Sequence, residues 1–201
     1  MRLTPFSATA RIWAAESTCV KKQVGAVIFN KKTKKLLSVG YNGTIAGKAH
    51  CDRYFCKSRG GFLVETDLIK LIPEAYWAMH VPFNVPIGES ESGDWCDEPG
   101  LWYNVSKEDW DLLHHKFAEK YEVHAEQNAV YNMLKLGTDL EDTENLVLLS
   151  TLEPCAQCAK LAASIGIQEV YFLEPYNKKR DPSIFETYGM EYRRVDGDED
   201  I

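Results

Sequence analysis

The chain has 201 residues, 45% hydrophobic and 26% charged, which is typical of a folded globular protein rather than a disordered or fibrous one. Its 23 basic and 30 acidic side chains give a formal net charge of −7. Such a surface repels a phosphate backbone and disfavours a general nucleic-acid binder. Neither a membrane span of roughly 18 apolar residues nor a signal-peptide core is present in the sequence. We therefore expect a single domain, residues 1 to 201, in the cytoplasm, with neither nucleic acid nor membrane as a partner.

The first half of the chain predicts one helix and a strand hairpin. Residues 7 to 17 are rich in helix formers and place apolar side chains at helical spacing. Two short apolar runs, at 24 to 29 and 36 to 39, are separated by a lysine-rich segment. This pattern is typical of two strands joined by a charged turn. The lysines could bind phosphate, but a solvated turn is the ordinary explanation.

Between Cys51 and about Ser106 the pattern is irregular. Prolines and glycines interrupt a stretch that nevertheless contains Trp77, Trp95 and Trp102. The segment is too apolar for a linker, and it is too short and too broken for a second core. We therefore expect an insertion at about 52 to 106 that packs on the main domain beside a site.

The second half returns to regular periodicity. It predicts helices at 109 to 121, 124 to 136, 155 to 165 and 182 to 188, and strands at 145 to 150, 169 to 173 and 191 to 195. The acidic residues at the C-terminus are expected to fray. This order of elements predicts an α/β sandwich with a mixed sheet.

The six cysteines favour metal ligation over disulfides, because the chain lacks a secretion signal. They are Cys19, Cys51, Cys56, Cys96, Cys155 and Cys158. Cys155 and Cys158 are three residues apart in the first turn of a predicted helix. Their sulfurs can therefore project to one side and bind one ion, and the helix dipole favours their thiolates. Alone, this pair would also fit a redox couple or two buried thiols.

His124 and Glu126 begin the preceding predicted helix. Residues two apart do not share a helix face, so one would bind the ion and the other would have a different role. A zinc ion held by His124, Cys155 and Cys158 would keep an open position for water, as catalytic zinc sites do. Two thiolates cancel the charge of the ion and acidify that water less, so a nearby base is needed. Glu126 can supply it.

A resemblance follows from these motifs together. The pattern H-x-E with P-C-x-x-C is the signature of zinc deaminases that act on cytosine or adenine. Over nearly its whole length the chain resembles deoxycytidylate (dCMP) deaminases, particularly those of bacteriophages, including their long insertion. The resemblance rests on Gln23-Val-Gly-Ala-Val, Gly40-Tyr-Asn-Gly43-Thr44, His124-Ala-Glu-Gln-Asn-Ala129 and Thr151-Leu-Glu-Pro-Cys-Ala-Gln-Cys158.

The resemblance implies a cytidine-deaminase-like three-layer α/β/α sandwich with a mixed five-stranded sheet and an inserted lobe. It implies hydrolysis of dCMP to dUMP and ammonia, with Glu126 as the proton shuttle at a catalytic Zn²⁺. It also implies contacts to the substrate from Asn42, Tyr176 and Lys178. Gly40, Tyr41 and Gly43 would belong to an allosteric nucleotide site, and their glycines would let backbone amides approach a nucleotide closely.

Further expectations come from the same resemblance. Such enzymes are activated by dCTP, with Mg²⁺ as companion ion, are inhibited by dTTP and form homo-oligomers, often hexamers. If the chain is phage-encoded, its compartment is the host-cell cytoplasm. A second, structural Zn²⁺ would be held by Cys19, Cys51, His114 and Glu122. On an unbroken helix His115 would face Glu122 better, so His114 requires the chain to leave the helix before Glu122.

Two alternatives stay open at this point. A tRNA adenosine deaminase would use the same zinc and glutamate, but it would need a basic face that a charge of −7 does not favour. A noncatalytic regulatory subunit stabilised by zinc would have no need of Glu126 beside an open coordination position.

Overall fold

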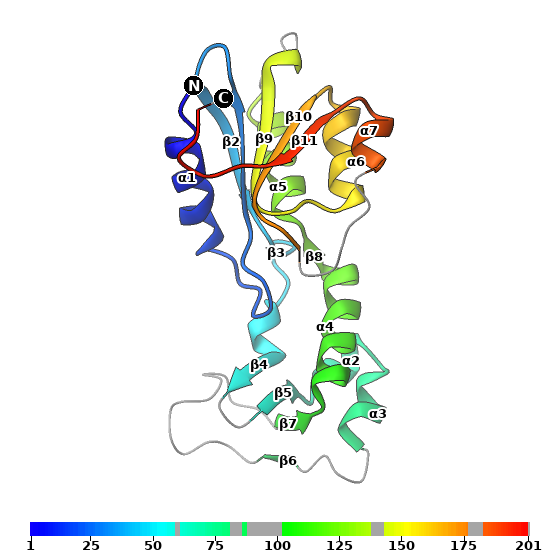
Figure 1. The fold of residues 1–201 in the computed structure, drawn as a ribbon. Helices are drawn as coiled ribbons and strands as arrows, with labels where there is room; N and C mark the ends of the chain where they lie inside the picture. The colour runs from blue at the N-terminus through cyan, green and yellow to red at the C-terminus, as the bar shows by residue number, and fades with distance from the viewer. Residues whose placement is uncertain (59–60, 81–85, 88–101, 138–142, 177–182, 201) are drawn as a thin grey trace. The chain divides into compact units, whose positions relative to one another are not determined.

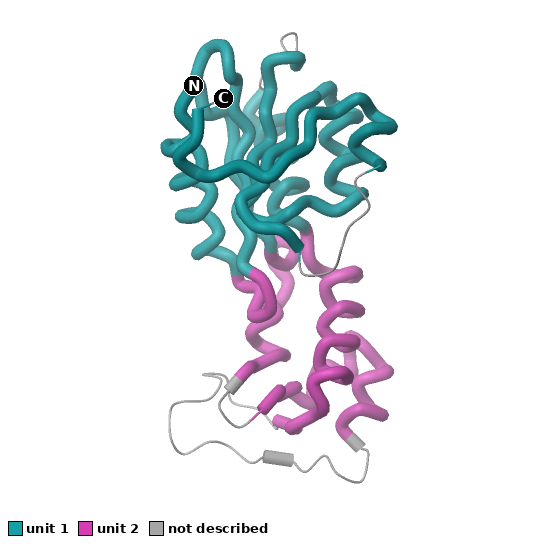
Figure 2. The backbone as a smooth tube through the Cα atoms, in the orientation of Figure 1, with its two compact units in different colours: residues 1–17, 23–42, 124–201 teal, residues 18–22, 43–123 magenta. Residues whose placement is uncertain are grey.

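The computed structural model describes residues 1–58, 61–80, 86–87, 102–137, 143–176 and 183–200. The chain divides into two compact units (Figure 2). Unit 1 comprises residues 1–17, 23–42 and 124–201, and unit 2 comprises residues 18–22 and 43–123. Unit 2 contains the predicted insertion, 52 to 106, and extends beyond it on both sides. None of the helices in the described ranges has the length and apolar character needed to cross a bilayer.

Unit 1 is built on a five-stranded sheet with strand order β11-β10-β9-β1-β2. Strand β1 pairs antiparallel with β2 and β9, and β10 pairs parallel with β9 and β11. This arrangement confirms the predicted mixed sheet. The strands are β1 (Gly25–Asn30), β2 (Lys35–Tyr41), β9 (Leu146–Leu152), β10 (Glu169–Glu174) and β11 (Glu191–Arg194). The helices are α1 (Thr4–Ala14), α5 (Ala125–Lys135), α6 (Ala156–Ser164) and α7 (Ser183–Thr187), and a 3₁₀ turn (Thr143–Asn145) precedes β9.

Helices cover both faces of this sheet, giving three layers (Figure 1). Every residue of β1 is buried, as expected for a strand covered on both sides. Ala26 and Ile28 pack with residues of α5, α6 and α7, whereas Val27 and Phe29 pack on the other face with residues of α1. The alternation of side chains along β1 therefore joins the two cores of unit 1.

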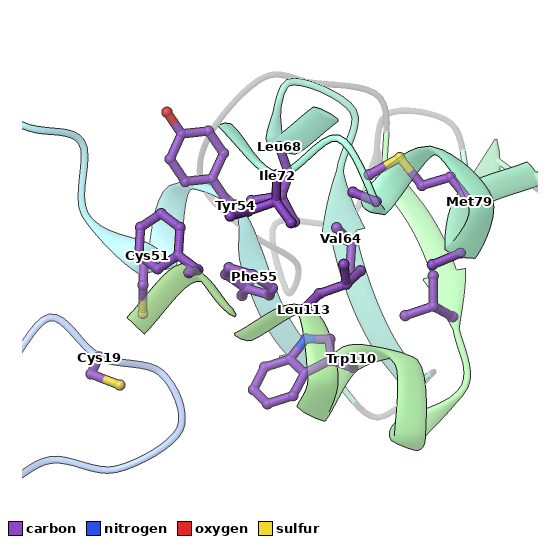
Figure 3. Close-up of a cluster of buried hydrophobic side chains, with 14 residues drawn as sticks. Cys19, Cys51, Tyr54, Phe55, Val64, Leu68, Ile72, Met79, Trp110 and Leu113 are labelled. Atoms are coloured by element: carbon purple, nitrogen blue, oxygen red, sulfur yellow. The ribbon is translucent and has the colours of Figure 1, made fainter. Parts of the chain in front are cut away.

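Unit 2 has its own core, so the prediction that the insertion is too short and broken for one is wrong. A four-stranded sheet of order β4-β5-β7-β6 packs with α4, and aromatic and aliphatic side chains fill the space between them (Figure 3). The elements are β3 (Gly43–Thr44), a 3₁₀ turn (Cys51–Arg53), β4 (Phe55–Ser58), β5 (Gly61–Glu65), α2 (Leu68–Leu71), α3 (Ala75–His80), β6 (Pro86–Ile87), β7 (Trp102–Val105), α4 (Lys107–Tyr121) and β8 (Glu122–Val123). Strands β3 and β8 form a separate antiparallel pair.

Trp110 shows how the core of unit 2 is closed. Its side chain is fully buried, and its indole N–H donates to the backbone oxygen of Leu63 in β5 at 3.2 Å. Phe55 from β4 meets the Trp110 ring edge-on, with ring centroids 5.7 Å apart. A buried indole needs such a partner for its N–H, and here the partner belongs to the sheet. Trp110 thus ties α4 to β5.

The C-terminal residues also differ from expectation, because they are anchored rather than frayed. The Leu3 N–H donates to the backbone oxygen of Glu199 at 3.0 Å, and Arg2 forms a bridge with Asp200. The Arg193 guanidinium pairs with the Glu199 carboxylate. Opposite charges and backbone bonds therefore fix the acidic segment.

Candidate active site

His124, Cys155 and Cys158 converge at the starts of two helices in unit 1. His124 is the N-cap of α5 and Cys155 is the N-cap of α6, both with extended backbone. The His124 Nδ1 atom lies 3.3 Å from Cys158 Sγ and 3.5 Å from Cys155 Sγ, and the two sulfurs are 3.4 Å apart. The structure thus brings the three predicted ligands of the first zinc together.

Local hydrogen bonds hold the ligands in this arrangement. The His124 backbone N–H donates to Gln127 Oε1 at 2.9 Å, which fixes the entry of the chain into α5. The Cys158 N–H donates to Cys155 Sγ at 3.4 Å, as an N-cap residue requires. The hydrogen bond between the sulfurs lowers the pKa of Cys155 to about 3. A thiolate at a helix N-terminus is the form that binds a metal ion.

The donor set fits zinc. Tetrahedral zinc, with Zn–S of about 2.3 Å and Zn–N of about 2.0 Å, places its ligand atoms roughly 3.5 to 3.8 Å apart. The three separations in this cluster, 3.3 to 3.5 Å, are within a few tenths of an ångström of those values. One imidazole and two sulfurs are also the ligand types that zinc prefers. The cluster holds three such ligands, so a fourth position would remain for water or substrate.

Glu126 lies beside this cluster without belonging to it. Its side chain is buried, and its Oε2 atom accepts a hydrogen bond from the Cys158 thiol at 3.5 Å. Burial raises the pKa of the Glu126 carboxyl, because removal from water disfavours the charged form. A buried carboxyl next to an open metal position is suited to receive and return a proton.

A second cluster lies within unit 2 and comprises the four residues that the resemblance implied, Cys19, Cys51, His114 and Glu122. One ligand atom from each lies within 4.8 Å of the others, and Cys19 Sγ is 3.4 Å from His114 Nε2. Hydrogen bonding to Cys51 lowers the pKa of Cys19 to about 3. Figure 3 shows Cys19 and Cys51 at one edge of the aromatic core. Two sulfurs, an imidazole and a carboxylate form a closed donor set for zinc.

The end of α4 selects His114 over His115. The helix ends at Tyr121, and Glu122 has extended backbone with φ −94° and ψ 143°. The side chain of Glu122 therefore leaves the helical register in which His115 would have faced it. His114 is buried, and its ring stacks on Trp110 with centroids 5.3 Å apart.

Cys56 departs from the expectation of metal ligation. It is disulfide-bonded, whereas Cys19, Cys51, Cys155 and Cys158 form no disulfide. Spacing along the sequence does not reveal such a pairing, because connectivity depends on the folded arrangement. Cys96 lies outside the described residues.

The residues predicted to contact the substrate differ in burial and in hydrogen-bond partners. Asn42 is buried, and its Oδ1 atom accepts from the Val24 N–H and from the Ser17 hydroxyl, both at 2.7 Å. Tyr176 is half-buried, and its backbone N–H donates to Glu153 Oε2 at 2.8 Å. Lys178 lies outside the described residues. Sequence reasoning missed Ser17 and Glu153, although each stands two residues before a candidate ligand cysteine.

The residues predicted for an allosteric site lie at the end of β2 and in β3. Gly40 and Tyr41 end β2, and Gly43 begins β3. Gly40 passes close to α5, where an added Cβ would lie 2.3 Å from the backbone oxygen of Ala125. Close packing of helix on strand is thus a sufficient reason for a glycine at this position.

Comparison with known proteins agrees with this geometry. The sequence model of the "Cytidine and deoxycytidylate deaminase zinc-binding region" matches residues 5–174. The chain belongs to the cytidine and deoxycytidylate deaminase family. It is 30% identical to the deoxycytidylate deaminase of Enterobacteria phage T2 over 180 residues, covering 90% of this chain and 84% of that protein. The phage T4 deoxycytidylate deaminase is 29% identical, with coverage of 90% and 81%.

The fold of this deaminase also matches a solved structure. The dCMP deaminase of cyanophage S-TIM5, crystallised in complex with dCMP and dUMP, superimposes with a TM-score of 0.53 at 20% identity. The match covers 95% of this chain and 94% of that one. The resemblance to phage deaminases and the three-layer α/β fold predicted from the sequence are confirmed. As a family member, the chain is a hydrolase that acts on a C–N bond.

Proposed function

We propose that the protein hydrolyses dCMP to dUMP and ammonia in pyrimidine deoxynucleotide metabolism. The observation that carries the proposal is the buried Glu126 carboxyl beside the cluster of His124, Cys155 and Cys158. The name of the T2 relative, whose length the chain largely covers, supports dCMP as substrate. The net charge of −7 favours a small nucleotide over an RNA stem.

In this proposal Glu126 moves protons through the whole reaction. Zn²⁺ bound by the three ligands would act as a Lewis acid and lower the pKa of a water molecule. Glu126 accepts a proton from the water that attacks carbon 4 of cytosine and delivers it to ring nitrogen 3. It then accepts the second proton from the new hydroxyl on carbon 4 and delivers it to the amino group. The carbon–nitrogen bond breaks as the carbonyl of dUMP forms, and ammonia leaves. Burial assists these transfers, because a raised pKa brings a carboxyl closer to the operating pH.

The remaining parts of the proposal rest on the family resemblance. Asn42 hydrogen-bonds the sugar or base of dCMP, Tyr176 lines the pocket and reaches the phosphate, and Lys178 is a further candidate for the phosphate. Gly40, Tyr41 and Gly43 belong to a regulatory site at which dCTP with Mg²⁺ activates and dTTP inhibits. The protein is a homohexamer in the cytoplasm of a host cell.

The second cluster, in this proposal, holds a structural Zn²⁺. Four protein ligands leave no position for substrate, so this ion would stabilise unit 2 without taking part in chemistry. The ion would join Cys19 and Cys51 to His114 in α4 and Glu122 in β8, which lie more than 60 residues further along the chain.

Replacement of Glu126 by Gln tests the mechanism. The amide keeps the size of the side chain but cannot exchange a proton, so we expect kcat for dCMP to fall at least about 100-fold. Zinc content should stay unchanged, since Glu126 is not among the clustered ligands. Ammonia release should be measured with dCMP, dCTP, cytidine and a tRNA anticodon stem. Appreciable turnover by zinc-loaded Glu126→Gln would refute the shuttle, and preference for the RNA stem would refute the substrate.

A further inference from the structure

The amide of Asn42 is held in one orientation by the surrounding chain. Its Oδ1 atom accepts from the backbone N–H of Val24 and from the hydroxyl of Ser17, each at 2.7 Å. A backbone N–H can only donate, so the oxygen end of the amide must face Val24. The same Ser17 hydroxyl lies 2.8 Å from the backbone oxygen of Asn42. The backbone N–H of Asn42 donates to the backbone oxygen of Val24 at 3.1 Å, so Asn42 and Val24 are joined by two hydrogen bonds.

Ser17 is itself fixed at the end of α1. Its N–H donates to the backbone oxygen of Ala14 at 3.1 Å, and its own backbone oxygen accepts from Gln23 Nε2 at 3.2 Å. Ser17 and Asn42 are both buried, with exposed fractions of 6% and 8%. A fixed, buried donor restricts the rotation of its partner more strongly than a mobile or hydrated one.

Two contacts also place the segment before Asn42 against the first turn of α5. The side-chain nitrogen of Asn128 donates to the backbone oxygen of Tyr41 at 2.8 Å. Gly40 approaches the backbone of Ala125, the residue between His124 and Glu126. Asn42 therefore follows a segment of chain that packs on the helix carrying the catalytic cluster.

We propose that Ser17 is a positioning residue that orients the Asn42 amide, so that its nitrogen presents N–H donors to an acceptor oxygen on the nucleotide. This inference rests on the proposed function, in which Asn42 contacts dCMP. The oxygen of the amide is committed to Val24 and Ser17. Selection by Asn42 is thus for a hydrogen-bond acceptor, such as a sugar hydroxyl or a base carbonyl.

Replacement of Ser17 by Ala removes one of the two donors and leaves Val24 to hold the amide. Loss of one hydrogen bond is expected to raise KM for dCMP about fivefold and to weaken dUMP binding equally. The kcat value should change less than about twofold, because the Ser17 hydroxyl acts on the amide that binds the nucleotide and not on the reacting atoms. Ser17→Cys, which has a weaker donor, should give an intermediate KM.

Ser7→Ala is the matched control. Ser7 is also a buried serine of unit 1, and its hydroxyl lies 3.1 Å from the Thr4 oxygen and 2.8 Å from the Gly197 oxygen, at the other end of α1. Ser7→Ala should lower Tm by about as much as Ser17→Ala does, but it should leave KM for dCMP unchanged. Zinc content of all variants must match the parent protein, because Cys19 is two residues from Ser17.

A double-mutant cycle with Asn42→Ala decides between positioning and general destabilisation. Asn42→Ala should raise KM about tenfold, and Ser17→Ala should then add less than about twofold. If Ser17→Ala has no effect alone, or an equal effect in both backgrounds, the positioning role is wrong although dCMP binding by Asn42 stands. If Asn42→Ala itself leaves KM unchanged, its assigned contact with the substrate fails and the inference fails with it.

Discussion

A methyl group at Gly40 tests how β2 supports the active site. An ideal Cβ at this position would lie 2.3 Å from the backbone oxygen of Ala125 and 2.3 Å from the backbone nitrogen of Ala129. Both atoms belong to α5, which His124 caps and which contains Glu126. Because the overlapping atoms are backbone, no rotation of a side chain relieves the clash. We therefore expect Gly40→Ala to displace α5 from β2.

The size of the effect follows from the distances. Non-bonded heavy atoms approach to roughly 3.5 Å, so α5 would have to move by about 1 Å. Overpacking of this kind costs about 1 to 3 kcal/mol, or roughly 3 to 10 °C in Tm for a chain of this length. A misplacement of about 1 Å at catalytic groups can lower the rate about 100-fold. The fall in kcat should thus exceed what the loss of stability explains.

Thermal melts, zinc analysis and kcat for dCMP together check this prediction. Gly197→Ala is the control, because the three atoms nearest to its Cβ would be side-chain atoms of Ser7 and Arg11, the first at 3.0 Å. It should lose less stability and keep kcat. Parent-like Tm and kcat for Gly40→Ala would refute the packing argument. If only the response to dCTP changed, Gly40 would belong to a nucleotide site instead.

Two further predictions concern unit 2. Cys51→Ser should lower the zinc content from two ions to one per chain and reduce Tm by about 5 °C or more, since a closed site contributes folding energy; a single zinc in metal-replete parent protein would exclude the second site. Burial raises the pKa of the Glu65 carboxyl, because the charged form is disfavoured away from water. The charged carboxylate therefore destabilises the folded protein above that pKa, and this destabilisation disappears as the pH falls and the carboxyl is protonated. Glu65→Gln should accordingly raise Tm at about pH 7.5 and lose this advantage at about pH 4; an equal shift at both pH values would contradict the assignment.

The central strands and the first metal cluster could be predicted because their signals are local. Apolar runs define β1, β9 and β10, and the ligand residues stand at predicted helix starts, with Pro154 directly before Cys155. Helical spacing predicts that the first helix starts at residue 7, whereas α1 starts three residues earlier, at Thr4. Pro5 suits the first turn of a helix, because the N–H that it lacks has no partner there.

The core of unit 2 could not be predicted because its pairings join distant segments. Strand β5 pairs with β7, so that Phe62 lies opposite Val105. Each strand is short, and prolines and glycines separate them in the sequence. Periodicity within a window of residues therefore indicates no sheet. The tryptophans show that the segment is too apolar for a linker, but only the long-range pairing of the strands shows what these side chains cover.

The break between α4 and α5 explains how one short segment serves both clusters. On a continuous helix Glu122 would stand about 12 Å along the axis from His114 and about 80° around it, so the two could not bind one ion easily. Extended backbone at Glu122 and at His124 releases both side chains from the helical register. In the sequence only Val123 stands between Glu122, a member of the second cluster, and His124, a member of the first. The backbone conformation of this segment is therefore a shared requirement, and a substitution that extended α4 through it would remove a ligand from each cluster.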